Sequence, residues 1–388
     1  MKIGSIVNDE RYRSGFFQIL TFGVFVWLIF YLITNTQNNL EARGMTVGYE
    51  FLFGTAGFSI AWTPLDYKPN DTYFFVYLVG IVNTLIVSFV SIILATLLGF
   101  LIGVLRLSKN WLTKQIAAWY VEIFRNTPLL LQIIFWYLAV FNSLPRPKQS
   151  LEILGLDTLV LNNRGFYFPK PEFGEYFWLT VVFLFFGLIL AFWNNARIKR
   201  KVSETGSPRA KFLPFLGITI GVPLIVFWLS GSPLVWTFPV LKGFNYSGGT
   251  FILPQMCAVL VALIVYHAAY IAETVRAGIL SVGRGQAEAA SSLGLKPVWT
   301  MRLVILPQAM RAIIPPLISA WMNVVKNSSL AIAIGFPDLV ALFMQTALNQ
   351  SGHAIEIVAM VMLFYMTVSL SISGCLNIYN KRIQLKER

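Results

Sequence analysis

Eight apolar runs, each close to the length that crosses a lipid bilayer, recur along this 388-residue chain. A helix needs about 20 mostly apolar residues to span the hydrocarbon core of a membrane. The runs are Phe16–Ile33, Tyr77–Leu105, Ile116–Phe141, Tyr176–Trp193, Phe212–Leu229, Phe251–Ile271, Ile313–Gly335 and Ala354–Leu376. Because 56% of the residues are hydrophobic and only 12% are charged, the chain has too few charges to cover a soluble globule of its size. The sequence predicts an all-α polytopic membrane protein with about eight transmembrane helices.

The net charge of +13 is unevenly distributed between the two sides of the predicted membrane. If the N-terminus is cytoplasmic, the cytoplasmic segments hold 21 of the 30 Lys and Arg residues and the external loops hold 7. Such an excess marks the cytoplasmic side of a membrane protein. The bias therefore predicts that both termini, and the loop that contains Glu288, lie in the cytoplasm. The charge reflects topology and does not indicate nucleic-acid binding.

The connection after the sixth run carries the most distinctive local pattern, GQAEAASSLGLKPVWTMRLVILPQAM, from Gly285 to Met310. It begins with good helix formers, breaks at Gly294 and Pro297, and continues as an amphipathic stretch that ends at Pro307. This order predicts a short exposed helix, a corner, and a helix that returns to the membrane. The pattern favours a docking element over an ordinary surface loop.

The same segment resembles the EAA loop of bacterial ABC-importer permeases. The family spacing is Glu-Ala-Ala, three residues, Gly, nine residues, Ile, one residue and Leu-Pro, and Val304 stands where Ile is usual. The resemblance implies that this loop docks in a groove of a separate ATP-hydrolysing subunit. The residues implied in this coupling are Glu288, Ala289, Ala290, Gly294, Leu295, Leu306 and Pro307.

An acid and a base lie within the third apolar run, where a charge is costly and usually faces a partner or a wet cavity. Glu122 and Arg125 are three residues apart on one helical face, so they could neutralise each other and fix the packing. Pro128 breaks the helix and exposes backbone carbonyls. The stretch RNTPLLLQ that starts at Arg125 resembles the signature of polar-amino-acid permeases, although Asn126 replaces the more common Gly. In this form it is similar to the branch that includes general L-amino-acid permeases.

Two further polar groups lie near apolar runs, one just after the sixth run and one within the seventh. Glu273 and Arg276 form either a helix-stabilising pair or a gate. The segment Lys326–Ser329 is followed by residues that unwind a helix, which indicates either a substrate path or polar packing between helices. The candidates for a substrate path are Arg125, Asn126, Thr127, Lys326, Asn327, Ser328, Ser329 and Asp338, and the candidates for a structural or gating role are Glu122, Glu273 and Arg276.

The chain contains no Gly-x-x-x-x-Gly-Lys-Ser/Thr motif, not even a Gly-Lys dipeptide, and no nucleophile and base that would indicate an enzyme. We therefore expect a transport subunit that binds no cofactor itself, with ATP and Mg²⁺ held by partner ATPases. The two cysteines and two histidines form no metal-binding pattern, so no metal site is expected.

We expect three parts: residues 1–76 with the first span, a permease domain at 77–380, and a cytoplasmic tail at 381–388. The permease domain would contain an inserted two-span hairpin at about 145–250 and the coupling loop at about 272–312. By resemblance, its remaining five helices would form a type I importer core, also called MetI-like.

The resemblance implies the permease subunit of an ATP-driven importer for polar L-amino acids in a bacterial inner membrane. Its implied partners are a homologous second permease in a heterodimer, two ATP-binding cassette subunits and an extracytoplasmic amino-acid-binding protein. If Glu122 pairs with Arg125, Lys326 remains as a free cation, which favours acidic and neutral substrates. The alternative, a secondary transporter driven by an ion gradient, would need a buried carboxylate relay and usually a repeat, and neither is evident.

Overall fold

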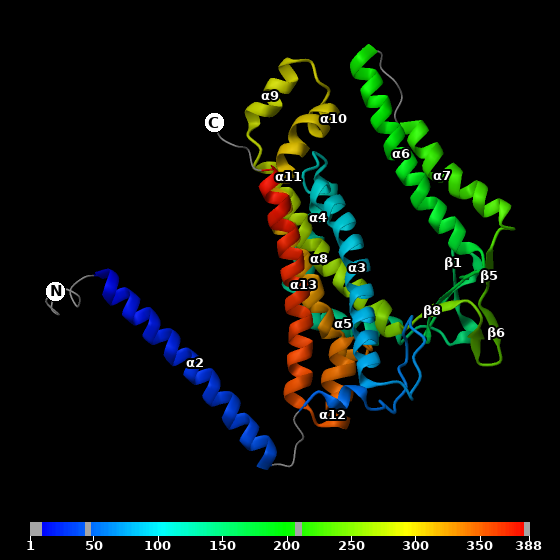
Figure 1. Ribbon diagram of the computed structural model, residues 1–388. Helices are drawn as coiled ribbons and strands as arrows, with labels where there is room; N and C mark the ends of the chain where they lie inside the picture. Colours follow the sequence, from blue (N-terminus) through cyan, green and yellow to red (C-terminus); the bar gives the residue numbers. More distant parts are fainter. Residues whose placement is uncertain (1–9, 43–47, 206–211, 384–388) are drawn as a thin grey trace. The chain divides into compact units, whose positions relative to one another are not determined.

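The computed structural model describes residues 10–42, 48–205 and 212–383 (Figure 1). The chain divides into two compact units. The first combines Met1–Tyr137 with Ala258–Arg388, and the second is Leu138–Cys257. The predicted insertion at 145–250 lies within the second unit.

Helices make up most of the first unit. Its α-helices are α2 (Glu10–Ala42), α3 (Tyr73–Leu105), α4 (Trp111–Asn126), α5 (Leu129–Phe135), α8 (Pro254–Leu280, which begins in the second unit), α9 (Arg284–Ser292), α10 (Pro297–Thr300), α11 (Leu306–Asn327), α12 (Leu348–Ser351) and α13 (Ala354–Ile383). Its shorter 3-10 or π-helical segments are η1 (Glu50–Phe53), η4 (Met301–Ile305), η5 (Ser328–Ile334) and η6 (Val340–Ala347). Segment η2 (Trp136–Phe141) begins in the first unit and continues into the second.

Six helices in the described ranges are long and apolar enough to cross a membrane, and a seventh span is reached if a bent pair counts as one. The bent pair consists of Trp111–Asn126 and Leu129–Phe141, which meet at 100°. The eight predicted runs lie mostly on helix, although the run Phe251–Ile271 begins in a strand and becomes helical only at Pro254. The run Phe212–Leu229 is too short for a full span, because its apolar helix covers only Pro214–Leu229. The predicted number of eight is therefore too high by this criterion.

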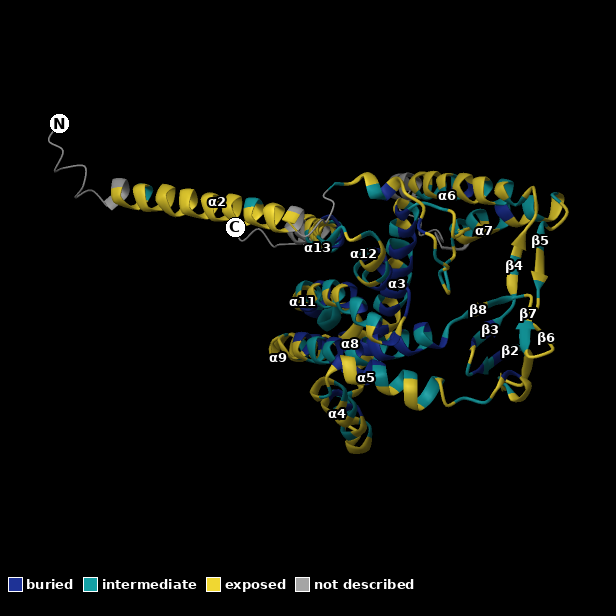
Figure 2. Ribbon diagram, turned by 90° about the horizontal axis from the view of Figure 1, so that it is seen from below, coloured by how far each residue is buried: buried dark blue, intermediate teal, exposed yellow. Residues whose placement is uncertain are grey.

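Apolar clusters hold the core of the first unit together, and two of them are the largest among the described residues. One joins the start of α3 to η6 and α13 through Val76, Phe343 and Ile357. The other joins the end of α3 to α8 and α11 through Ile271 and Ile313, among others. These helices are partly buried, whereas α2 is exposed along its described length, as Figure 2 shows. Its apolar surface is suited to contact with lipid.

Glycines allow α3, α8 and α11 to approach one another closely. A Cβ atom at Gly103 would lie 2.7 Å from the carbonyl oxygen of Ala272, and one at Gly99 would lie 2.6 Å from the Cβ of Ile271. A Cβ atom at Gly278 would collide with the side chain of Ile313. Small residues at helix contacts are a common means of close packing in membranes, where the lipid supplies no hydrophobic driving force.

The second unit contains a helix pair and three small sheets. Helix α6 (Phe177–Thr205) packs against α7 (Phe212–Leu229). A four-stranded antiparallel sheet has the order β1-β2-β3-β8, with bounds Leu151–Ile153, Leu156–Asn162, Gly165–Phe168 and Thr250–Ile252. Two further sheets pair β4 (Lys170–Phe173) with β5 (Leu234–Thr237) and β6 (Val240–Lys242) with β7 (Asn245–Ser247).

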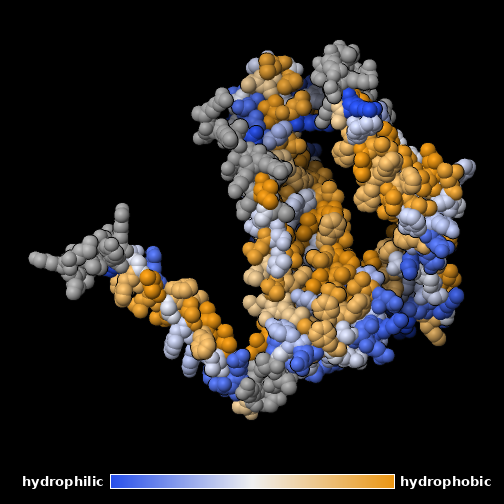
Figure 3. Space-filling model, viewed as in Figure 1, coloured by the Kyte–Doolittle hydropathy of each residue, from blue (hydrophilic) through white to orange (hydrophobic). Residues whose placement is uncertain are grey.

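The pairing of β4 with β5 joins the segment before α6 to the segment after α7, so it closes the helix pair at one end. Figure 3 shows hydrophobic residues over the helices, whereas hydrophilic residues gather at their ends. This distribution is the one expected of helices that cross a bilayer.

Candidate functional site

A cavity of about 650 Å³ lies in the first unit, along α8 and α11. Its lining residues are Arg125, Tyr266, His267, Tyr270, Glu273, Thr274, Ala277, Gly278, Ser281, Ala312, Pro316, Ser319, Ala320, Asn323 and Asn327. Most of the lining thus comes from one face of α8 and one face of α11. A cavity of this size can hold a small molecule.

Arg125 reaches this cavity from the end of α4. Its guanidinium lies 5.0 Å from the centre of the Tyr270 ring, and the Tyr270 hydroxyl donates to the Arg125 carbonyl oxygen at 3.5 Å. A hydrogen bond of 3.2 Å joins the hydroxyls of Tyr266 and Tyr270. The anticipated ion pair between Glu122 and Arg125 is not formed among the described residues. That interpretation was wrong because Arg125 finds an aromatic partner on another helix instead.

The predicted helix break at Pro128 is present, and a side chain stabilises it. Gln132 Nε2 donates to the carbonyl oxygens of Phe124 at 3.0 Å and Thr127 at 2.9 Å. These carbonyls lose their helical partners where the chain turns by 100°. Sequence reasoning assigned no role to Gln132, although an amide in the first turn after a proline was a usable signal.

The structure separates the other candidates for a substrate path. Asn327 lines the cavity, but Lys326 is exposed and is not among the lining residues. Ser328 Oγ and Ser329 Oγ donate to carbonyls in the last turn of α11, both at 2.7 Å. Asn126 and Thr127 lie at the break beside Arg125 without lining the cavity. The role of each of these residues stays a prediction.

Asp338 lies apart from the cavity, where the chain unwinds as predicted. Helix η5 ends at Gly335, which has a left-handed φ of 72°, and η6 begins at Val340. Asp338 is 1% exposed, and its Oδ1 accepts a hydrogen bond of 2.8 Å from the Ala341 amide. This bond caps the start of the next helix.

His267 is a cavity residue that sequence reasoning missed, because the predicted sixth run placed it near a span end. Helix α8 continues to Leu280, so His267 lies near the middle of the helix and is only 3% exposed. Its Nε2 lies 3.3 Å from Asn327 Nδ2. An ionisable residue inside an apolar run was the signal that could have identified it.

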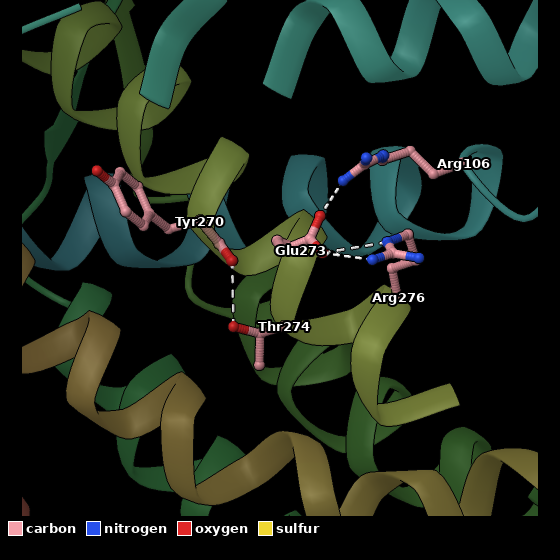
Figure 4. Close-up of polar contacts among 5 residues, drawn as sticks. All are labelled: Arg106, Tyr270, Glu273, Thr274 and Arg276. Carbon is pink, nitrogen blue, oxygen red and sulfur yellow. Dashed lines mark hydrogen bonds and ion pairs between the residues drawn. The ribbon is translucent and has the colours of Figure 1, made fainter. Parts of the chain in front are cut away.

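Glu273 forms a three-residue ion cluster, shown in Figure 4. It accepts bonds of 2.6 and 3.2 Å from Arg276, one turn further along α8. Its other oxygen accepts a bond from Arg106, the residue that ends α3. The predicted pairing of Glu273 with Arg276 is present. Arg106 extends this pair to a second helix, and the side chains of Arg106 and Glu273 are partly buried. The cluster therefore links α3 to α8.

The segment from Gly285 to Met310 has the predicted exposed helix and glycine corner. After α9, Gly294 adopts a φ of 76°. The Gly294 amide donates to Ser291 O at 2.9 Å, and the Leu295 amide donates to Ala290 O at 3.1 Å. These two bonds define a Schellman motif, which satisfies the last carbonyls of a helix. Ala290 is buried at the corner, whereas Glu288 and Ala289 are exposed.

Pro307 does not end the second stretch, contrary to expectation. The chain passes from α10 through the π-helical turn η4 into α11, and Pro307 lies in the first turn of α11. The Leu306 amide bonds to Met301 O, one residue further back than in an α-helix. The wider turn accommodates a proline that has no amide hydrogen to donate.

Within the described part of the chain, no group of three or more His, Cys, Asp and Glu side chains could hold a metal ion. Cys257 is a free thiol.

Residues 184–385 match the family model described as the binding-protein-dependent transport system inner membrane component. The chain is 47% identical over 97% of its length to a putative amino-acid ABC transporter permease of Escherichia coli K12, of which 95% is covered. The chain belongs to this family. It is therefore a multi-span permease subunit of a bacterial ABC transport system in the inner membrane, and it is not an enzyme by itself.

Two further relatives also match almost end to end. A general L-amino acid transport system permease of Rhizobium johnstonii is 44% identical over 99% of this chain and 95% of its own. A glutamate/glutamine/aspartate/asparagine transport system permease of Rhodobacter capsulatus is 40% identical over 100% of this chain and 97% of its own. The expected polytopic helical fold is confirmed, whereas the small sheets of the second unit were not expected.

Proposed function

We propose that this subunit carries acidic and neutral polar L-amino acids, namely glutamate, aspartate, glutamine and asparagine, in an ATP-driven importer. The observation that carries the proposal is the near end-to-end similarity to a permease named for these four amino acids. Similarity to a general L-amino acid permease supports the same broad class.

The charges around the cavity support this choice. Arg125 and Glu273 are the charged residues among its described lining, and Glu273 is bonded to Arg106 and Arg276. The local balance is therefore positive, which attracts carboxylates and repels cationic side chains. Arg125 can also donate two parallel hydrogen bonds to a carboxylate. Arg125 thus replaces Lys326 as our preferred contact for the substrate carboxylate.

The exposed corner is the proposed contact with the ATPase. Leu293 is 82% exposed and Val298 is 75% exposed, although both are apolar. Large apolar side chains gathered on a protruding element are suited to a protein partner. Docking would involve Glu288, Ala289, Gly294 and Leu295, while Ala290, Leu306 and Pro307 would support the element from behind. ATP and Mg²⁺ would bind in the partner, because the chain has no phosphate-binding loop motif.

The cavity also favours a partner permease subunit. Its described lining comes from two helices and Arg125, which leaves one side for a partner to close. A homologous but distinct permease would close the open side, two ATP-binding cassette subunits would dock below, and an extracytoplasmic binding protein would deliver the substrate. In this arrangement both termini are cytoplasmic, and residues 77–380 form the permease domain with its insertion.

Competition for uptake of labelled L-glutamate tests the substrate class. We expect L-aspartate, L-glutamine and L-asparagine to compete and L-arginine and L-lysine not to compete. Arg125→Met should weaken uptake more than Lys326→Met, because only Arg125 lines the cavity. If arginine and lysine compete best in the wild type, the proposed substrate class is wrong.

Gly294→Arg tests the coupling role. A left-handed conformation costs a residue with a side chain about 1–2 kcal/mol, and the long side chain would obstruct the docking face. We expect transport to fall by at least about tenfold, the equivalent of 1.4 kcal/mol, with normal membrane insertion. Gly294→Asn is the matched control, because Asn tolerates this backbone conformation. Wild-type transport by Gly294→Arg would contradict the coupling role.

A further inference from the structure

His267 is a buried polar residue whose role the substrate-carboxylate contact does not explain. It lies on the α8 face of the cavity, with its ring edge-on to Tyr266 at 5.2 Å between ring centres. Buried polar side chains in proteins are almost always hydrogen-bonded. The hydrogen-bond partner of His267 is Asn327 on α11, across 60 residues of sequence. This contact joins the two walls of the cavity.

The chemistry of this contact fixes the direction of the hydrogen bond. The amide nitrogen of Asn327 has hydrogens to donate and no acceptor capacity. With the Asn327 amide oriented as in the structure, His267 Nε2 accepts this bond at 3.3 Å and the imidazole proton lies on Nδ1. The carboxamide oxygen of Asn327 then accepts no hydrogen bond from the described residues, and Asn327 is one of the residues that line the cavity.

The cavity consequently offers two complementary groups. Arg125 supplies only hydrogen-bond donors and a positive charge, whereas the Asn327 oxygen supplies an acceptor. Every L-amino acid carries a carboxylate and an ammonium group on the same carbon. Donors match the carboxylate, and a carbonyl oxygen matches the ammonium group.

We propose that His267 positions Asn327 so that its carboxamide oxygen accepts a hydrogen bond from the α-ammonium group of the substrate. The inference rests on the proposed function, because it assumes an amino acid in this cavity. His267 is a positioning residue and Asn327 is the contact. Without the His267 acceptor, the Asn327 amide can rotate and present its NH₂ group, which cannot bind an ammonium.

The test is equilibrium binding to the complete transporter in nanodiscs, without the extracytoplasmic binding protein. The probes are labelled L-glutamate and glutarate, which has the same chain and carboxylates but lacks the ammonium group. We expect the wild type to prefer L-glutamate by at least about tenfold, corresponding to one good interaction with a charged group. His267→Leu should remove most of this preference by weakening L-glutamate binding while glutarate binding stays unchanged.

His267→Gln is the conservative variant, since its amide oxygen can accept from Asn327, and it should restore much of the preference. Asn327→Leu should lose the preference as His267→Leu does. If His267→Leu weakens both probes equally, or neither, the positioning role is overturned. If the wild type binds glutarate but shows no preference for L-glutamate, the ammonium contact is wrong. If the wild type binds none of L-glutamate, L-glutamine and glutarate, the substrate proposal fails and this inference fails with it.

Discussion

The corner at Gly294 and the break at Pro128 both interrupt a helix, but they satisfy the interrupted backbone in different ways. At the corner the backbone supplies its own donors, because the Gly294 and Leu295 amides donate to carbonyl oxygens of α9. At Pro128 the Gln132 side chain, from the following helix, donates to two carbonyls. The exposed corner also has water at hand, whereas a break within a bilayer has none and needs an internal donor. The setting of each interruption thus determines its chemistry.

Cysteine labelling tests whether the corner is exposed to water and the helix break is buried, and each site should be either labelled or unlabelled. In a background without Cys257 and Cys375, Ser292→Cys at the corner should react with a membrane-impermeant thiol reagent only after the cells are permeabilised. Asn70→Cys, in the loop before α3, should react in intact cells. Ile133→Cys, 0% exposed beside the break, should react in neither case. Labelling of Ser292→Cys in intact cells would invert the topology and contradict a cytoplasmic docking element.

Replacing Gln132 should have a large effect on stability. Gln132→Met keeps the length of the side chain but removes both hydrogen bonds to the break. An unsatisfied buried polar group costs about 1–3 kcal/mol, so we expect a loss of about 2 kcal/mol for these partly buried carbonyls. SDS titration of the purified transporter measures this change in the free energy of unfolding. Leu131→Met, at the exposed neighbouring position, should stay within about 0.5 kcal/mol of the wild type. Equal stabilities would show that Gln132 does not support the break.

The smallest effect is expected from Gly294→Ala, which should change only the local stability of the corner. Gly294→Ala places a methyl group where the structure has open space, so only the backbone conformation is penalised, by about 1 kcal/mol. Hydrogen exchange of the Leu295 amide, which bonds to Ala290, should accelerate by about fivefold to tenfold. Exchange at Ile133 should not change. If both regions accelerate together, the corner does not open independently of the helix break.

The features predictable from sequence were those with strong local signals. The apolar runs lie on helices because about 20 consecutive apolar residues leave few alternatives. The corner followed from Gly294 and Pro297, whose backbone preferences act locally. Most strands of the second unit escaped prediction because strands of three or four residues, such as Leu151–Ile153, are too short to show alternation.

The polar contacts of the site were less predictable, because they depend on which helices meet. Glu122 and Arg125 have the right spacing for a pair, yet the cation lies against Tyr270, 145 residues away in sequence. Arg106 and Glu273 are separated by 167 residues. Spacing within one helix predicted the Glu273–Arg276 contact correctly, since both partners lie on α8. Contacts between distant segments require the fold.

The close glycine contacts of α3, α8 and α11 have a mechanical consequence. The side chains of Ile271 and Ile313 fill the space beside Gly99 and Gly278, so these helices cannot slide past one another without a collision. Helix α8 leads into the exposed corner, and α11 leads out of it. Both ends of the corner are therefore attached to closely packed helices. If a partner moves the corner, we expect α3, α8 and α11 to turn together, and the cavity lining on α8 and α11 to keep its shape.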